Sequence, residues 1–267
     1  MAARPAPGGL KAARPGKPHN TLAAYVLHRY DWSESSLILD LFTREQGRLA
    51  VAAKGAKRPF SQLRAVLLPF QRIHVTLGRA RSETAMSEVQ TLRGAEWGGG
   101  AAMLTGAALF SGFYLNELLM KLLARHDPHP HLFDAYASTL GALDPLSETS
   151  VESALRAFEL TLLREVGVLP DLSLVTLTQE HVDAASPYAL LPEAGVAAPR
   201  VEQARLPGAV LLSLQAALMH GSLPALRQAC ASALPELKNA LRGLLHYHLG
   251  TDQLRTRQVL LTLPTSY

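Results

Sequence analysis

Short apolar runs separated by turn residues occupy the first third of the chain, and each run is long enough for one strand. The run at residues 71–78 (QRIHVTLG) alternates polar and apolar side chains, as a half-buried strand does. The residues that link the second and third runs end in Gly47, which suits a turn with positive φ and predicts a hairpin. We therefore expect five strands, at residues 21–28, 36–43, 47–53, 71–78 and 83–92. Five short strands in close succession predict a small closed barrel of the OB type, with an SH3-like barrel as the alternative that periodicity leaves open.

A glycine run at residues 98–100 ends the strand pattern, and apolar residues then recur at helical spacing. In the third predicted helix, Ser150 is a candidate N-cap and Gly167 a candidate C-terminal stop. Residues 168–205 are rich in Pro and Ala with weak periodicity, so we expect a loop-rich insertion there. The helices are expected at residues 101–125, 132–143, 150–167, 208–220, 223–234 and 237–250.

The two patterns together predict a multidomain α+β chain. An OB-fold domain at residues 20–97 is followed by an all-α helical domain at residues 98–267, which carries the insertion. Residues 1–19 combine Arg and Lys with Ala, Pro and Gly and lack an apolar stretch. We expect this segment to be a disordered basic tail and not a secretion signal.

Charge divides the chain at the same point. Residues 1–97 contain 15 Lys and Arg against 7 Asp and Glu, whereas residues 98–267 contain 11 against 15. A basic first part joined to a mildly acidic second part favours a polyanion-binding module on a scaffold that contacts other proteins.

Membrane and disulfide classes are disfavoured by the same sequence. No stretch offers ~18 uninterrupted apolar residues, so we expect a soluble, cytoplasmic, nucleoid-associated protein. The single cysteine, Cys230, excludes an intramolecular disulfide framework and a four-cysteine zinc site. We expect it to be buried as a small hydrophobe.

The segment at residues 52–64 (AAKGAKRPFSQLR) gathers four cations around one aromatic residue, Phe60. Cations neutralise phosphates and an aromatic ring stacks on an unpaired base, so the segment is suited to nucleic acid, with a solvated surface loop as the alternative. The cations are Lys54, Lys57, Arg58 and Arg64. Further arginines could extend the surface, although each taken singly is typical of a solvated barrel rim: Arg48, Arg72, Arg79, Arg81 and Arg93.

Candidate catalytic and metal-binding groups are sparse. For Trp32, Ser33 and Glu34 we favour structural roles, with Trp32 in the barrel core or as its lid. The histidines of HDPHPH (residues 126–131) are interpreted as part of an interhelical turn and not as a metal site. The chain contains no G-x-S-x-G, Walker A or H-E-x-x-H motif, so we predict no catalytic residue, no metal and no cofactor.

Several motifs in a fixed order resemble those of the bacterial RecO DNA repair family. They are W-S-E-x-S at residues 32–36, F-T-x-x-x-G-R at 42–48, A-K-G-A at 53–56, L-x-P-F at 67–70, LFSGFYLNELL at 109–119 and LRAFELTLL at 155–163. A weaker likeness returns at residues 254–259 (LRTRQV). Many members carry a four-cysteine zinc module in the region of residues 168–205, where this chain has no cysteine, so the resemblance implies a zinc-less type.

The resemblance implies an N-terminal OB-fold, a helical C-terminal domain and a non-enzymatic recombination mediator. Members bind single- and double-stranded DNA, anneal complementary strands, associate with RecR and with the acidic tail of single-stranded-DNA-binding protein (SSB), and help RecA onto coated DNA. The DNA-binding residues implied here are Lys54, Lys57, Arg58 and Arg64, with Arg48 second. The residues implied for the partner tail are Arg156, as the carboxylate clamp, with Phe158, Leu162 and Val166.

Two other function classes compete with this one. An RNA-binding OB-fold protein without mediator activity would explain the barrel and its charge but not the helical motifs. A hydrolase lacks any supporting motif. Whether the helical domain touches DNA is left open by the sequence, and the candidates there are Lys238, Arg242, Arg255 and Arg257.

Overall fold

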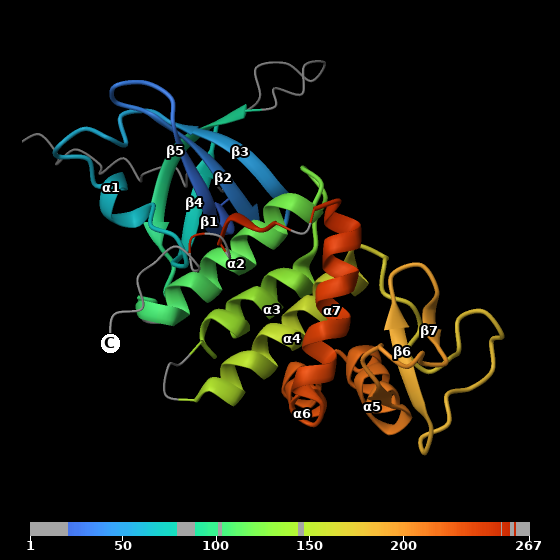
Figure 1. The fold of residues 1–267 in the computed structure, drawn as a ribbon. Coiled ribbons are helices and arrows are strands. Elements are labelled where there is room, and N and C mark those ends of the chain that lie inside the picture. The colour runs from blue at the N-terminus through green and yellow to red at the C-terminus, as the bar shows by residue number, and fades with distance from the viewer. Residues whose placement is uncertain are drawn as a thin grey trace, which may run out of the picture.

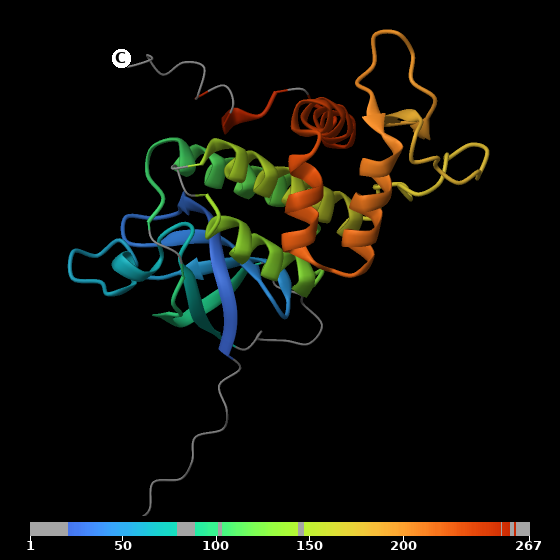
Figure 2. The ribbon, with the colours of Figure 1, turned by 90° about the horizontal axis from the view of Figure 1, so that it is seen from below.

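A computed structural model describes residues 21–78, 89–100, 103–143, 147–251, 253–256 and 259. A β-barrel lies against a bundle of helices, and a small sheet sits at the far end of that bundle (Figures 1 and 2). The predicted basic tail at residues 1–19 lies outside the described residues.

The barrel contains five strands and one short helix in the described residues. They are β1 (Thr21–Asp31), β2 (Leu37–Thr43), β3 (Gly47–Ala53), α1 (Leu63–Val66), β4 (Arg72–Leu77) and β5 (Val89–Trp97). The strand order around the closed barrel is β1-β2-β3-β5-β4, and β1 pairs with β4 to close it. The β3–β5 pair is parallel and the others are antiparallel. This topology confirms the predicted barrel of the OB type.

Two strands differ from their predicted bounds. β1 continues to Asp31, and its last residues pair with β2 as far as Leu37. These residues are exposed, so the hairpin projects beyond the barrel and lacks the apolar pattern that marks a strand in sequence. The fifth strand was predicted at residues 83–92; in the described part it runs from Val89 to Trp97.

The helical part begins after the glycine run. Its helices are α2 (Gly106–Leu122), α3 (Pro130–Leu140), α4 (Glu148–Glu165), α5 (Gly208–Met219), α6 (Leu223–Ala231) and α7 (Leu234–Leu249). The N-cap of α4 is Ser147, whose hydroxyl accepts from the Ser150 amide at 3.3 Å, so the predicted N-cap Ser150 lies inside the helix. Gly167, with φ +76°, follows the end of the helix as predicted.

Residues 168–205 are not only loop. A three-stranded sheet of order β7-β6-β8 is built from β6 (Pro187–Leu191), β7 (Gly195–Ala197) and β8 (Leu206–Pro207), so the helical part is not all-α. Leu190 and Val196 are buried in the helical core and tie the sheet to it. Strands this short carry too few residues for alternation to be detected in the sequence.

One apolar core is shared by the two parts of the molecule. The rings of Tyr25 and Phe42 on the barrel lie 5.2 and 5.4 Å from that of Phe133 on α3. Tyr25 also meets Tyr136 edge-on at 5.0 Å. The barrel interior forms a second, separate core. Because aromatic side chains bury large apolar areas, this contact fixes the barrel on the helices.

Candidate functional site

Two loops meet at one end of the barrel. One is the projecting hairpin at residues 28–37, and the other is the loop at residues 54–64; together they are called the cationic end. Lys57 joins them, because its amide donates to the Ser35 carbonyl at 3.0 Å and its Nζ donates to the Ser33 carbonyl at 3.0 Å. Lys57 Nζ also lies 3.0 Å from Asp31 Oδ1. Of the predicted cations, Lys57 therefore has a structural role within the surface.

The second loop is folded into successive turns. Gly55 takes φ +72°, and the amides of Arg58 and Ser61 donate to the carbonyls of Gly55 and Arg58 at 3.2 and 3.0 Å. Ala56 is buried and anchors the loop on the barrel core. Lys54, Arg58 and Arg64 are exposed, so the loop displays the remaining predicted cations to solvent on a fixed backbone.

Exposed aromatic side chains accompany these cations. Phe60 is 99% exposed, Trp32 57% and Tyr30 46%. The expectation that Trp32 would lie in the barrel core or cover it is wrong, because Trp32 follows the last residue of β1 in the projecting hairpin. Aliphatic side chains such as Leu39 and Leu49 fill the barrel interior instead.

Arg29 belongs to the same surface and was not predicted. It is exposed on β1, and its Nη1 donates to the Leu67 carbonyl at 3.3 Å. The cationic end contains five Lys or Arg against two Asp or Glu. Single arginines in a strand carry no sequence signal; only the pairing of β1 with β2 beyond the barrel places this one beside the loop.

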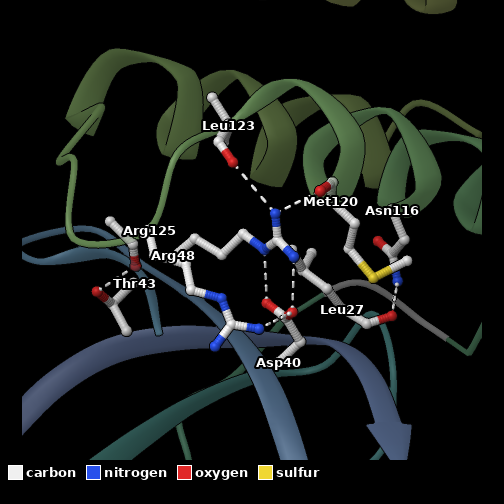
Figure 3. A network of polar contacts seen from close by, with 9 residues as sticks. Leu27, Asp40, Thr43, Arg48, Asn116, Met120, Leu123 and Arg125 are labelled. Atoms are coloured by element: carbon white, nitrogen blue, oxygen red, sulfur yellow. Dashed lines mark hydrogen bonds and ion pairs between the residues drawn. The ribbon is translucent and has the colours of Figure 1, made fainter. Parts of the chain in front are cut away.

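Arg48 lies elsewhere and is engaged in bonds inside the molecule (Figure 3). Its Nε and Nη2 donate to the two oxygens of Asp40 at 2.8 and 2.9 Å, and Asp40 is 1% exposed. Its Nη1 donates to the carbonyl of Met120 on α2 and, at 3.1 Å, to the carbonyl of Leu123, which follows α2. Arg125 adds a contact of 3.5 Å to Asp40. The structure therefore separates Arg48 from the cationic end and uses it to join barrel and helices.

The other arginines considered for this surface fall into two groups. Arg93 is exposed on β5, while Arg72 is half-buried on β4, with its Nε unpartnered among the described residues. Arg79 and Arg81 lie outside the described residues.

A pocket of about 620 Å³ opens between α2, α4, α7 and the segment that follows α7. Its apolar lining includes Phe110, Val151, Leu155, Leu245 and Leu254. Three cations, Arg156, Lys238 and Arg242, and two carboxylates, Glu148 and Glu152, also line it. Lys238 Nζ lies 2.5 Å from Glu152 Oε1, and Arg242 forms no ion pair with the described residues. An apolar floor with a cationic side suits a ligand that is itself apolar and acidic.

Arg156 is held on the wall of this pocket by a buried carboxylate. Its Nη2 lies 2.7 Å from Glu159 Oε1, which also accepts from the Tyr114 hydroxyl at 2.6 Å. Burial raises the pKa of Glu159 although Arg156 acts to lower it. Glu159 Oε2 and Arg156 Nε have no hydrogen-bond partner among the described residues. The clamp predicted from sequence thus lines the pocket, supported by a partner that the sequence did not indicate.

The other residues predicted for the partner tail do not line this pocket. Phe158 and Leu162 are fully buried in the helical core. Phe158 lies two residues after Arg156 on α4, about 200° round the helix axis, so it faces away from the pocket. Val166 is half-buried at the end of α4, whereas the pocket is lined by the first half of that helix.

The other side chains considered in the sequence analysis lie apart from the cationic end and from the pocket. His129 contacts Asp127 and Glu165 at 3.3 Å each. Among the described residues no three or more His, Cys, Asp or Glu side chains are arranged so that they could hold a metal ion. Cys230 is buried as predicted, and burial raises the pKa of its thiol to about 12. Among the described residues no helix is long and apolar enough to cross a membrane.

Comparison with known proteins gives the same likeness over both parts of the chain. The model "Recombination protein O N terminal" matches residues 19–96, and "Recombination protein O C terminal" matches residues 103–258. The chain is 50% identical to DNA repair protein RecO of Polaromonas sp. (strain JS666) over 242 residues, which cover 90% of this chain and 95% of the relative. It is 48% identical to that of Albidiferax ferrireducens over 242 residues, covering 90% and 94%. It is 50% identical to DNA repair protein RecO of Verminephrobacter eiseniae over 242 residues, which cover 90% of this chain and 94% of the relative.

Proposed function

Because the chain belongs to the RecO family of DNA repair proteins, we propose that it is a recombination mediator. In this proposal it binds single- and double-stranded DNA, anneals complementary strands and, together with RecR, helps to load RecA onto DNA coated with SSB. It supplies binding surfaces and no chemical step, and it needs no cofactor.

The cationic end of the barrel carries the proposal. Its exposed cations, Lys54, Arg58 and Arg64, neutralise phosphates and release their counterions, which supplies affinity without sequence preference. Phe60 and Trp32 offer faces on which unpaired bases stack, and such stacking tolerates any base. A surface that combines the two suits strands that are partly unpaired, which is the state of DNA during annealing.

The pocket on the helical part supports the second half of the proposal, the docking of the acidic C-terminal tail of SSB. An apolar side chain of the tail enters between Phe110 and Leu155, and its carboxylates meet Arg156 and Arg242. Glu148 and Glu152 line the pocket too, so the tail's acidic groups belong on the side of Arg242. Phe158, Leu162, Val166 and Arg48 have no part in this proposal.

The decisive experiment is the annealing of complementary oligonucleotides coated with SSB that has either an intact or a deleted tail. We expect annealing without ATP that depends on the tail and falls as salt is raised, because both surfaces are needed and the DNA contacts are ionic. Salt-sensitive binding without annealing would overturn the mediator proposal and favour a generic OB-type module, for which RNA is the next ligand to test.

A further inference from the structure

The chain after α7 returns to lie beside α2 (Figures 1 and 2). Leu254 is 5% exposed and packs into the helical core, and both Leu254 and Thr256 line the pocket. Arg255, between them, is exposed. Residues 254–256 are called the strap. Gly250, with φ +64°, ends α7 and allows the chain to turn back.

A single carboxylate on α2 holds the strap. Glu117 Oε1 accepts from the Arg255 amide at 2.9 Å, and Glu117 Oε2 accepts from the Thr256 amide at 3.0 Å and the Thr256 hydroxyl at 2.7 Å. Lys121, one turn along α2, lies 3.4 Å from Oε1. Each oxygen of Glu117 therefore has a donor from the strap, and the ion pair is additional.

The contact stabilises Glu117 as well as the strap, because Glu117 is itself buried, with 6% of its surface exposed. A buried carboxylate with few donors is costly, so the hydrogen bonds of the strap satisfy a group for which α2 supplies only the ion pair to Lys121. Burial alone would raise the pKa of Glu117, but the hydrogen bonds from Thr256 and Arg255 outweigh it and lower that pKa. Glu117 is thus charged at neutral pH and fixes the backbone of the strap.

We propose that the strap is a working wall of the partner-tail pocket, and that Glu117 is the positioning residue that holds it there. The hydrogen bonds between Glu117 and the strap are called the latch. Without the latch, Leu254 and Thr256 move away, the pocket is open on one side and the tail loses part of its apolar contact. With it, the exposed Arg255, which lies between two lining residues, is held as a further cation for the acidic part of the tail. The inference rests on the proposed function, since it assumes that the pocket binds the tail.

The test uses two full-length variants that break the latch from opposite sides, Glu117→Gln and Thr256→Pro. The first removes the charge and one of the two acceptor oxygens, and the second removes both donors of Thr256. The probe is a fluorescent peptide with the acidic C-terminal sequence of the cognate SSB. We expect each variant to bind it about tenfold more weakly than the wild type, which corresponds to 1.4 kcal/mol. The amide of Arg255 should exchange its hydrogen faster in both variants, because its fixed acceptor is lost or displaced.

Lys121→Ala is the matched control, because it removes the ion pair and leaves the three hydrogen bonds of the latch. It should bind the peptide within about twofold of the wild type, and all variants should retain DNA affinity, which reports an intact barrel. If exchange is faster but peptide affinity is unchanged, the strap is not part of the site; if exchange is unchanged, Glu117 is not the latch. A wild-type protein that binds no peptide would instead refute the proposed pocket itself.

Discussion

Arg48 and Arg58 lie on β3 and in the loop that follows it, yet their guanidinium groups meet different surroundings. Arg48 is bonded to the buried Asp40 and to two backbone carbonyls, whereas Arg58 is exposed. Lys57 is intermediate, because it ties the two loops of the cationic end together. Residue by residue, exposure separates the cations that hold the fold from those that remain for a ligand.

The double variant Arg58→Ala with Arg64→Ala tests the exposed cations. We expect weaker DNA binding and a salt slope lower by about 1–2 units, because two phosphate contacts are removed. The measurement is a titration of labelled single-stranded DNA at several salt concentrations, with unfolding curves to confirm unchanged stability. Arg200→Ala with Arg205→Ala removes the same charge from the exposed surface of the helical part and should leave the slope unchanged. Equal slopes for both double variants would refute the assignment of the loop.

At the scale of elements, α4 serves two purposes on its two faces. Phe158 and Leu162 are buried in the core, while Val151, Leu155 and Arg156 line the pocket. The Tyr114 hydroxyl on α2 donates to Glu159 Oε1 on α4 at 2.6 Å and links the two helices. Arg156 is therefore both a wall of the pocket and the counterion of a buried carboxylate.

Removing Arg156 alone should destabilise the protein by about 3–5 kcal/mol, because it leaves Glu159 buried without its counterion. The pair Arg156→Ala with Glu159→Gln should recover most of this loss, as measured by urea unfolding. The pKa of Glu159 is already raised in the folded protein, so its folded form holds the proton more tightly than the unfolded form. The stability of the single variant should therefore fall as the pH rises above the ordinary pKa of a glutamate side chain.

The control for this experiment is Arg242→Ala, which lines the same pocket and forms no ion pair with the described residues, although its charge also acts on Glu159. It should cost at most about 1 kcal/mol, well below the cost of Arg156→Ala. If the single and double variants of Arg156 are equally stable, the buried pair does not support the fold. Peptide binding is best compared in the double variant, since a loss in the single variant would mix unfolding with a lost contact.

For the whole molecule, the contact between barrel and helices is both apolar and polar. Tyr25 and Phe42 enter the helical core, and Asn116 on α2 donates to the Leu27 carbonyl at 2.9 Å while accepting from Tyr136 at 2.5 Å. Gly47 lies so close to Asp127 that an added Cβ would stand 2.0 Å from the Asp127 carbonyl oxygen. Contacts this close make the two parts one folded unit.

We therefore expect a single unfolding transition, seen alike by tryptophan fluorescence and by far-ultraviolet circular dichroism. The two tryptophans, Trp32 and Trp97, belong to the barrel, whereas the dichroism reports mainly the helices. Arg48→Ala should lower the stability by about 3 kcal/mol, because Arg125 is then the one counterion left to Asp40 among the described residues. The two transitions should stay coincident. Arg44→Ala, at the exposed Arg44–Asp134 pair, should cost under about 1 kcal/mol. Two separate transitions in the wild type would show that the parts unfold independently.

The pattern of apolar residues predicted a five-stranded barrel followed by helices, because alternation and helical spacing are local properties of the sequence. It left an SH3-like barrel open, and the strand order of the structure decides for the OB type. It missed the small sheet at residues 187–207, whose strands are too short for a pattern, and the exposed end of β1, where the core imposes none. The cationic loop was readable as a cluster of like charges, and its residues 54, 58 and 64 are exposed.

The sequence by itself determined which residues are cations, where the first four barrel strands and the helices lie approximately, and which family the motifs resemble. Only the tertiary structure decided that Arg48 is bonded to Asp40 at the contact between the two parts, that Arg29 and Trp32 join the loop, and that the chain after α7 returns to Glu117. The reason is physical: these roles depend on contacts between residues far apart in the chain. Burial and hydrogen-bond partners are set by packing and not by neighbours in sequence.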